Sequence, residues 1–341
     1  MERIANGSVA RAVTPTVMIA AVLVTAACGG RVVRTSAEDP TRVDVTQLWS
    51  DPADLETRDL FAGPTEGSSP PDPAQPFTFI EADRSGFSPG YDVRDADGVT
   101  WSVKLGPEAQ TEVVASRILW AIGYHQLPTY YLSSWSMNGG PEGDPGPGRF
   151  RPELRDRKVV GEWSWHENDF VHTRPFTGLI VANLILNNWD WKTSNNKVYE
   201  VTRADGTSVR RYVVRDLGAS LGKTSSPPPF RWLGTRIAQG NRNSLEDFEA
   251  QGFIEQVTGD RIDFDYSGIY DAVVETVRVD DVLWTARLLS RLSDAQWSDA
   301  FRAAGYPPDQ ASRYIAKLKS KVAQGLALGQ ATPASVSSSA R

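Results

Sequence analysis

Two short segments in the middle of the chain carry the side chains that could do chemistry. The first, NNWDWKTSNN, contains Asp190 and, five positions later, Asn195. The second, YVVRDLGASLG, contains Asp216 followed by Leu217 and Gly218. Transfer of a phosphoryl group needs a carboxylate close to the acceptor hydroxyl, and an amide and a second carboxylate on magnesium. The order of these residues therefore predicts a phosphoryl-transfer site that uses Mg²⁺.

Each of these side chains has an expected role. We expect Asp190 to act as the base for the acceptor hydroxyl or to orient it, and Lys192 to neutralise the phosphate being transferred. Asn195 and Asp216 are expected to bind the metal, with Asn196 as the alternative to Asn195, because Mg²⁺ prefers oxygen ligands. The plainer explanation is that Asn and Asp residues form a turn after a helix. That explanation accounts for one of these residues but not for the ordered set.

A lysine and a glutamate earlier in the chain could hold the phosphates of a nucleotide. Lys104 lies in the apolar segment WSVKLG, which reads as a strand, so its side chain points opposite to those of Val103 and Leu105. A glutamate on the next helix should hold this lysine. Glu112 is the first candidate and Glu108, one helical turn earlier, is the second. The alternative is an exposed strand lysine beside an exposed helix glutamate.

A glycine-containing loop precedes this lysine. The segment SGFSPG contains Gly86 and Gly90, and glycine lets backbone amides approach phosphate closely. The spacing of these two glycines does not match G-x-G-x-x-G. We expect them to cover the phosphates, although a simple turn explains the segment as well.

The elements around these residues form two groups. In residues 77–137, we predict strands in FTFIEADR, after SGFSPG, in VTWSVKLG and in PTYYLSSWSM, with a hairpin at Asp97-Gly98. A helix over 108–122, ended by Gly123, lies between the last two strands. This stretch is a small β-rich lobe with one helix.

Residues 138–325 form the second, mainly helical group. Its expected elements are a loop at 138–148, short strands and a loop in 150–168, a helix at 176–188, a hairpin at 197–216, a break at 225–230 and helices at 280–292, 294–305 and 308–326. The final residues, 326–341, are expected to be a disordered tail.

The first residues of the chain look like an export signal. Arg3 and Arg11 precede an apolar run from Val13 to Ala27, which is too short to span a bilayer, and Cys28 follows. We predict a signal peptide of the lipoprotein type over 1–27 and lipid attachment at Cys28. Residues 28–76 are then a disordered linker, and the protein is anchored in the cell membrane on its extracytoplasmic side. An uncleaved signal anchor with an incidental cysteine is the alternative.

Composition excludes several classes of protein. The net charge of −6 argues against nucleic-acid binding, which needs a basic surface. A single cysteine allows no internal disulfide. His166 and His172 flank Asp169 but lack the further partners of a zinc site. The sequence has no Walker loop.

Taken together, the pattern resembles the protein-kinase-like superfamily over roughly residues 77–325. The residues that carry the resemblance are Lys104, Glu112, Asp190-x-Lys192-x-x-Asn195 and Asp216-Leu217-Gly218. The chain is more similar to the atypical HipA-type and phosphoinositide-3-kinase-type branches than to typical Ser/Thr kinases. It departs from the family at Asn188-Trp189, where typical kinases have His-Arg. It also has Lys192 where the atypical branches have His, and it lacks an Ala-Pro-Glu segment.

The resemblance implies a two-lobed α+β fold that binds ATP and Mg²⁺ between its lobes. Together with the signal segment and Cys28, it predicts a kinase-like bacterial lipoprotein with an unknown phosphoryl acceptor. Two other functions stay open. One is a catalytically inactive kinase-fold scaffold or interaction lipoprotein of the cell envelope. The other is a carbohydrate-binding envelope protein, suggested by the Trp and Tyr content and requiring aromatic side chains in an exposed groove. Because Lys104, Asp190, Asn195 and Asp216 are all present, we expect nucleotide binding at least.

Overall fold

The computed structural model describes residues 43–65, 68–83, 88–224, 240–266 and 270–330. The expected signal segment, Cys28, Gly86, the break at 225–230 and most of the expected tail lie outside these residues, so they stay predictions. Helix α7 extends to Ala327, which places the last ordered element slightly beyond the expected start of the tail. No helix in the described part of the chain has the length and apolarity needed to cross a membrane.

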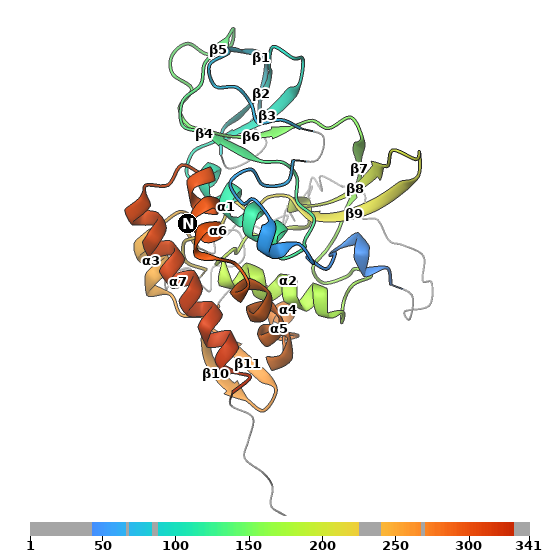
Figure 1. The fold of residues 1–341 in the computed structure, drawn as a ribbon, viewed down its shortest axis with the longest axis vertical. Coiled ribbons are helices and arrows are strands. Elements are labelled where there is room, and N and C mark those ends of the chain that lie inside the picture. The colour runs from blue at the N-terminus through green and yellow to red at the C-terminus, as the bar shows by residue number, and fades with distance from the viewer. Residues whose placement is uncertain (1–42, 66–67, 84–87, 225–239, 267–269, 331–341) are drawn as a thin grey trace, which may run out of the picture. The chain divides into compact units, whose positions relative to one another are not determined.

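The small lobe is built on a six-stranded sheet with the strand order β4-β6-β3-β2-β1-β5 (Figure 1). Its strands are β1 (Phe77–Asp83), β2 (Gly90–Arg94), β3 (Thr100–Leu105), β4 (Tyr130–Leu132), β5 (Met137–Asn138) and β6 (Gly148–Pro152). The hairpin at Asp97-Gly98 is confirmed, with Gly98 at a positive φ of 82°. The lobe boundary at residue 137 is wrong, because β6 pairs with both β3 and β4. Two arginines in this short strand hide its β pattern.

The two faces of this sheet have opposite character. Strand pairing places Tyr91, Val103 and Phe150 in one row, and this face belongs to an apolar core with Phe77 and Trp101. Successive strand residues point to opposite faces, so the residues between them form the other face. Two rows cross that face, and they are Gly90–Lys104–Arg149 and Asp92–Ser102–Arg151. The face that carries Lys104 is therefore polar.

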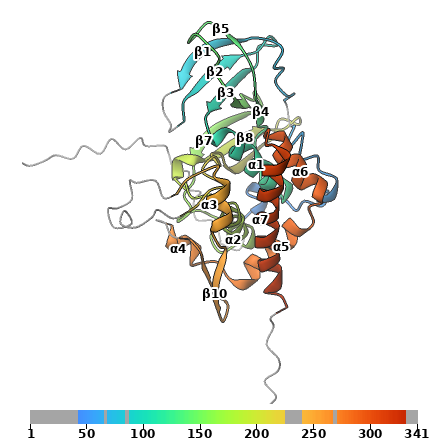
Figure 2. The ribbon, with the colours of Figure 1, turned by 90° about the vertical axis from the view of Figure 1, so that its left-hand side faces the viewer.

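Helix α1 (Glu108–Ala121) lies between this sheet and the helices below it, as Figures 1 and 2 both show. It ends at Ala121, and Gly123 follows the C-cap residue with a φ of 102°. A Cβ at Gly123 would lie 2.3 Å from the carbonyl oxygen of Ser50, so the close approach of an earlier segment also requires glycine. The predicted helix and its glycine stop are confirmed.

That earlier segment corrects the expected linker. Two 3₁₀ helices, η2 (Val45–Gln47) and η3 (Leu55–Thr57), lie within residues 43–65. Leu48, Leu55 and Leu60 are buried in the main core. The expectation that residues 28–76 are a disordered stalk is therefore wrong for 43–65. Averaged composition hid these leucines, because each stands alone among polar residues yet each finds a place in the core.

The large lobe has the helices that the sequence predicts. They are α2 (Arg174–Ile185), α5 (Val279–Ser290), α6 (Asp294–Ala303) and α7 (Pro308–Ala327). The predicted hairpin is β8 (Asn196–Thr202) and β9 (Ser208–Val214), and β7 (Arg157–Glu162) joins it as a third strand. In both Figures 1 and 2, the helices α2, α5 and α7 lie below the six-stranded sheet.

The stretch between the hairpin and α5 is less helical than expected. It contains the short helices α3 (Leu245–Ala250) and α4 (Asp271–Val274) and a second hairpin, β10 (Ile254–Thr258) with β11 (Arg261–Phe264). Gly259 occupies the turn of this hairpin with a φ of 65°. Strand β10 is mostly exposed, and β11 alternates exposed and buried residues over only four positions, which is too short a pattern to reveal it.

Candidate active site

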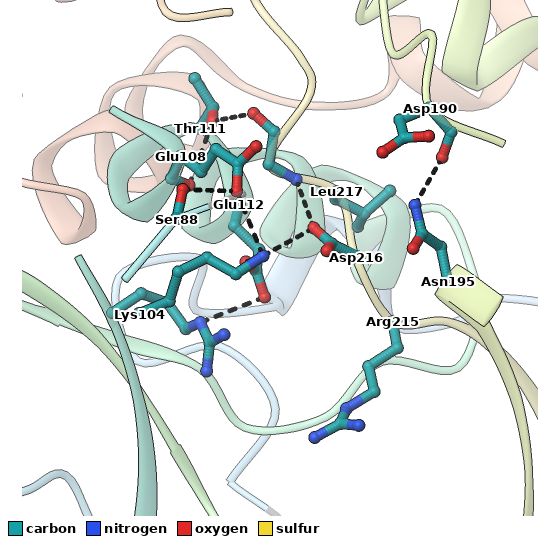
Figure 3. Close-up of polar contacts among 12 residues, drawn as sticks. Ser88, Lys104, Glu108, Thr111, Glu112, Asp190, Asn195, Arg215, Asp216 and Leu217 are labelled. Atoms are coloured by element: carbon teal, nitrogen blue, oxygen red, sulfur yellow. Dashed lines mark hydrogen bonds and ion pairs between the residues drawn. The ribbon is translucent and has the colours of Figure 1, made fainter. Parts of the chain in front are cut away.

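Lys104 lies at the centre of the candidate site, within ion-pair distance of three carboxylates (Figure 3). Its Nζ is 2.8 Å from Asp216 Oδ1, 3.2 Å from Glu112 Oε2 and 3.4 Å from Glu108 Oε2. The structure thus brings both candidate glutamates to this lysine. The alternative of an exposed pair is wrong, because only 1% of the Glu112 side chain is exposed.

Neighbouring charges keep this cluster ionised. Burial acts to lower the pKa of Lys104, but the carboxylates of Glu112 and Asp216 outweigh it and raise that pKa. Burial acts to raise the pKa of Asp216. The Lys104 ammonium and hydrogen bonds from Lys104 and the Gly218 amide outweigh burial and hold the pKa far below its usual range. Both groups are therefore charged at neutral pH.

Two buried arginines that the sequence did not reveal also hold Glu112. Arg149 Nε lies 3.2 Å from Glu112 Oε1, and the Arg151 guanidinium donates to the same oxygen. Arg151 also donates to the carbonyl of Arg215 over 2.8 Å. Burial acts to raise the pKa of Glu112, but Arg149, Lys104 and Arg151 together lower it. Burial and the Arg149 charge lower the pKa of Arg151 to about 10.

The segment that follows Asp216 packs directly against α1. Thr111 Oγ1 donates to the carbonyl of Gly218 over 2.7 Å. A Cβ at Gly218 would lie 2.7 Å from Cβ of Glu108, so this close contact requires glycine. Glu108 also accepts hydrogen bonds from Ser88 and from the Arg242 guanidinium. Helix α1 therefore fixes Asp216 in two ways. It binds the backbone of the segment that follows Asp216, and its glutamates hold Lys104, which pairs with Asp216.

Asp190 and Asn195 lie on the other side of Asp216 from Lys104 in Figure 3. Asn195 Nδ2 donates to the carbonyl of Asp190 over 2.8 Å, and the Asn195 carbonyl accepts from the Arg215 amide over 2.8 Å. Asn195 thus links the Asp190 loop to the chain just before Asp216. Lys192 Nζ lies 2.8 Å from Asp190 Oδ2, so the two predicted catalytic side chains form an ion pair.

The two candidate asparagines differ in position. Asn195 uses its amide nitrogen within the loop, and in Figure 3 its amide oxygen lies on the side that faces Asp216. Asn196 is fully buried and donates from Nδ2 to the carbonyl of Trp163 over 3.1 Å. The geometry therefore favours Asn195 as the partner of Asp216. An amide oxygen and a carboxylate suit Mg²⁺, which commonly takes few protein ligands together with phosphate oxygens.

The Asp190 loop is supported from below by a lysine that the sequence did not reveal. Helix α2 ends at Ile185, and Asn187 follows with a φ of 51°. Lys321 of α7, which is 0% exposed, donates to the Ile185 carbonyl over 3.2 Å and to Asn187 Oδ1 over 2.5 Å. Burial, together with the nearby charge of Lys317, lowers the pKa of Lys321 well below its usual value.

Gly90 has a structural explanation. It begins β2 opposite Lys104, and a Cβ there would lie 2.4 Å from the carbonyl oxygen of Val103. Close strand packing is sufficient reason for this glycine, and its expected contact with phosphate stays a prediction.

In the described part of the chain, no three His, Cys, Asp or Glu side chains gather as a metal site.

These features define the class of the fold. A sheet carries a lysine on its third strand, and the following helix supplies the paired glutamate. A loop with Asp190 and Asn195 and a strand end with Asp216 then follow in the helical lobe. This is a two-lobed, kinase-like α+β fold, as the sequence predicts.

No family model and no curated protein matches the chain. Among solved structures, the crystal structure of the Helicobacter pylori proinflammatory kinase CtkA is similar over 76% of this chain and 99% of its own, with 13% identity and a TM-score of 0.44. Kinase activity is a property of CtkA, and the similarity does not assign it to this chain. The HipA-type branch, the phosphoinositide-3-kinase-type branch and the lipoprotein class stay predictions.

Proposed function

We propose that this protein binds a nucleoside triphosphate with Mg²⁺ between its lobes and transfers a phosphoryl group to an acceptor that is still unknown. ATP is the nucleotide that the resemblance implies. The observation that carries the proposal is the Lys104 cluster, which joins Glu108 and Glu112 of the small lobe to Asp216 of the large lobe. A buried, ionised cluster between two lobes is a typical place for a ligand.

The charges of the cluster favour an anionic ligand. The three carboxylates of the cluster, Glu108, Glu112 and Asp216, are contacted by four cations, which are Lys104, Arg149, Arg151 and Arg242. Burial, together with the charge of Arg149, lowers the pKa of Arg151. A triphosphate next to Lys104 would bring negative charge to a region that has an excess of positive charge.

Each site residue then has a distinct role. Lys104 binds the α- and β-phosphates, and Glu112 holds Lys104 in place. Asp216 is the most open of the three carboxylates, with 37% of its side chain exposed, so it is the one available to a metal, together with Asn195. When bound, the metal would bridge phosphate oxygens and offset their charge. Asp190 orients the acceptor hydroxyl, and Lys192, its ion-pair partner, neutralises charge on the phosphoryl group.

We also propose that lipid on Cys28 anchors the protein to the cell membrane, with the folded part outside the cytoplasm. Export and lipidation rest on the sequence of residues 1–28. ATP is scarce outside the cytoplasm, so in this location the protein would act with limited ATP or with another phosphodonor.

Titration calorimetry with Lys104→Met tests the proposal. Methionine keeps much of the side-chain volume but removes the charge that meets the phosphates. We expect magnesium-nucleotide binding by the natural protein and at least about a tenfold weaker binding by the variant, the loss typical of a charge-assisted hydrogen bond. Binding that is unchanged in Lys104→Met would contradict the assignment.

The alternative functions have different support. The inactive scaffold uses the same fold and is favoured if neither ATP nor GTP binds. The carbohydrate-binding function needs exposed aromatic side chains, but Trp101, Trp163, Trp165, Trp191 and Trp297 are all buried. We therefore do not propose it.

A further inference from the structure

A cavity of about 1650 Å³ adjoins the Lys104 cluster. Residues that line it include Asp92, Ser102, Arg151, Leu154, Tyr199 and Arg215. Ser102 lies on the same strand face as Lys104, and Arg215 immediately precedes Asp216. The cavity therefore lies next to the proposed phosphate site at Lys104 and Asp216, and its volume is more than large enough for a nucleoside.

One wall of this cavity is the polar face of the small-lobe sheet. The row Gly90–Lys104–Arg149 faces the phosphates in the proposed function. The adjacent row, two residues along each strand and so roughly 7 Å away, is Asp92–Ser102–Arg151. If the first row holds phosphates, the second faces the sugar and base of the same nucleotide. The inference below rests on that assignment.

Two side chains at this cavity have unused hydrogen-bonding capacity. The Asp92 carboxylate makes no hydrogen bond or ion pair with any residue that the structure describes. Burial raises the pKa of Asp92, and the carboxylates of Glu81, Asp83 and Glu153 raise it further. Arg215 Nε is buried without a partner among the described residues. In Figure 3, the Arg215 side chain points away from Asp190 and Asn195. A carboxylate acceptor and a guanidinium donor are thus both available at the cavity.

Purine bases differ in what they offer such a pair. Guanine presents two adjacent donors, N1–H and the N2 amine, which match the two oxygens of a carboxylate. It also presents the O6 and N7 acceptors, which match a guanidinium. Adenine presents the N1 lone pair, which a carboxylate repels, beside a single amine. We propose that the cavity binds guanine and that the nucleotide of this site is a guanine nucleotide, with Asp92 accepting from the base and Arg215 donating to it.

The test compares three nucleotides by titration calorimetry with magnesium: GTP, ATP and xanthosine triphosphate. We expect the natural protein to bind GTP at least about tenfold more tightly than ATP, the usual size of one paired contact with a base edge. Asp92→Asn should lose this preference and gain affinity for xanthosine triphosphate, because its amide can donate to the 2-oxo group of xanthine. This exchange of preference is not expected from a merely structural change.

Asp97→Asn is the matched control, since Asp97 lines the same cavity from the exposed hairpin turn and should leave all three affinities unchanged. Equal or tighter binding of ATP by the natural protein would overturn the guanine inference while leaving the proposed function intact. Binding of none of the three would overturn both. The comparison of GTP with ATP uses the natural protein, so it is decisive even if Asp92→Asn does not fold.

Discussion

At the scale of single residues, Glu112 is held by Lys104, Arg149 and Arg151, whereas Glu108 meets Lys104, Ser88 and Arg242. The first glutamate is enclosed by the small lobe, and the second connects to the large lobe. Both glutamates thus share Lys104 but serve different purposes. Glu112 positions the lysine, and Glu108 positions the segment that carries Asp216.

Asp190→Asn separates binding from chemistry at this scale. Asp190 contacts Lys192 and not the Lys104 cluster, so we expect nucleotide affinity to stay within about twofold. Phosphoryl transfer, measured as release of phosphate to water or to any acceptor, should fall by about a hundredfold or more, the usual effect of losing a general base. Asp263→Asn, at an exposed position of strand β11, should change neither quantity. Unchanged transfer in Asp190→Asn would show that Asp190 has no catalytic role.

Some of these residues could be predicted from the sequence because their signal lies in spacing along the chain. Asp190, Asn195 and Asp216 form one such series, and Lys104 with Glu112 follows from a strand that leads into a helix. Arg149, Arg151 and Lys321 could not be predicted in the same way, because each acts on a residue that is close only after folding. The two arginines alternate with Phe150, a hint that β6 has one charged face.

At the scale of elements, the segment 43–65 is part of the folded structure rather than a stalk. Leu55→Ala tests this, because Leu55 is 0% exposed within the core. Removing a buried leucine side chain should lower the free energy of unfolding by about 2–5 kcal/mol, measured by denaturant titration. Phe61→Ala, in the same segment but largely exposed, should cost much less. Equal, small effects of both substitutions would mean that this segment is a linker and does not contribute to the core.

Helix α7 supports the Asp190 loop through Lys321, and the contribution of Lys321 to the free energy of unfolding depends on pH. The pKa of Lys321 is lower in the folded protein than in the unfolded chain, where it is near 10.5. Between the two values the unfolded chain binds the proton and the folded protein does not, so this contribution to stability grows as pH rises.

We therefore expect the difference in unfolding free energy, natural protein minus Lys321→Met, to increase between pH 7 and pH 9. Lys319→Met, at an exposed position of the same helix, serves as the control and should show no such trend. A difference that does not change with pH would mean that Lys321 stays charged in the folded protein.

At the scale of the whole molecule, the lobes meet at the candidate site itself. Lys104 to Asp216, Thr111 to Gly218 and Glu108 to Arg242 all cross from the small lobe to the large one. The two-lobed plan could be predicted from the order of strands and helices. The boundary between lobes could not, because β6 comes after a long loop yet completes the first sheet. The polar wall of the cavity could not be predicted either, because its row Asp92–Ser102–Arg151 depends on strand register, which spacing along the chain does not reveal.

Thermal unfolding of the full chain with GTP or ATP, in the presence and absence of magnesium, tests the central claim most directly. A ligand that binds only the folded protein stabilises it by about 2.7 kcal/mol at a hundredfold excess over its dissociation constant. We predict a magnesium-dependent rise in the unfolding temperature for the natural protein. Asp216→Ala, compared with its own ligand-free midpoint, should lose that rise. An equal rise in Asp216→Ala, or no rise with either nucleotide in the natural protein, would contradict a metal-nucleotide site at Asp216.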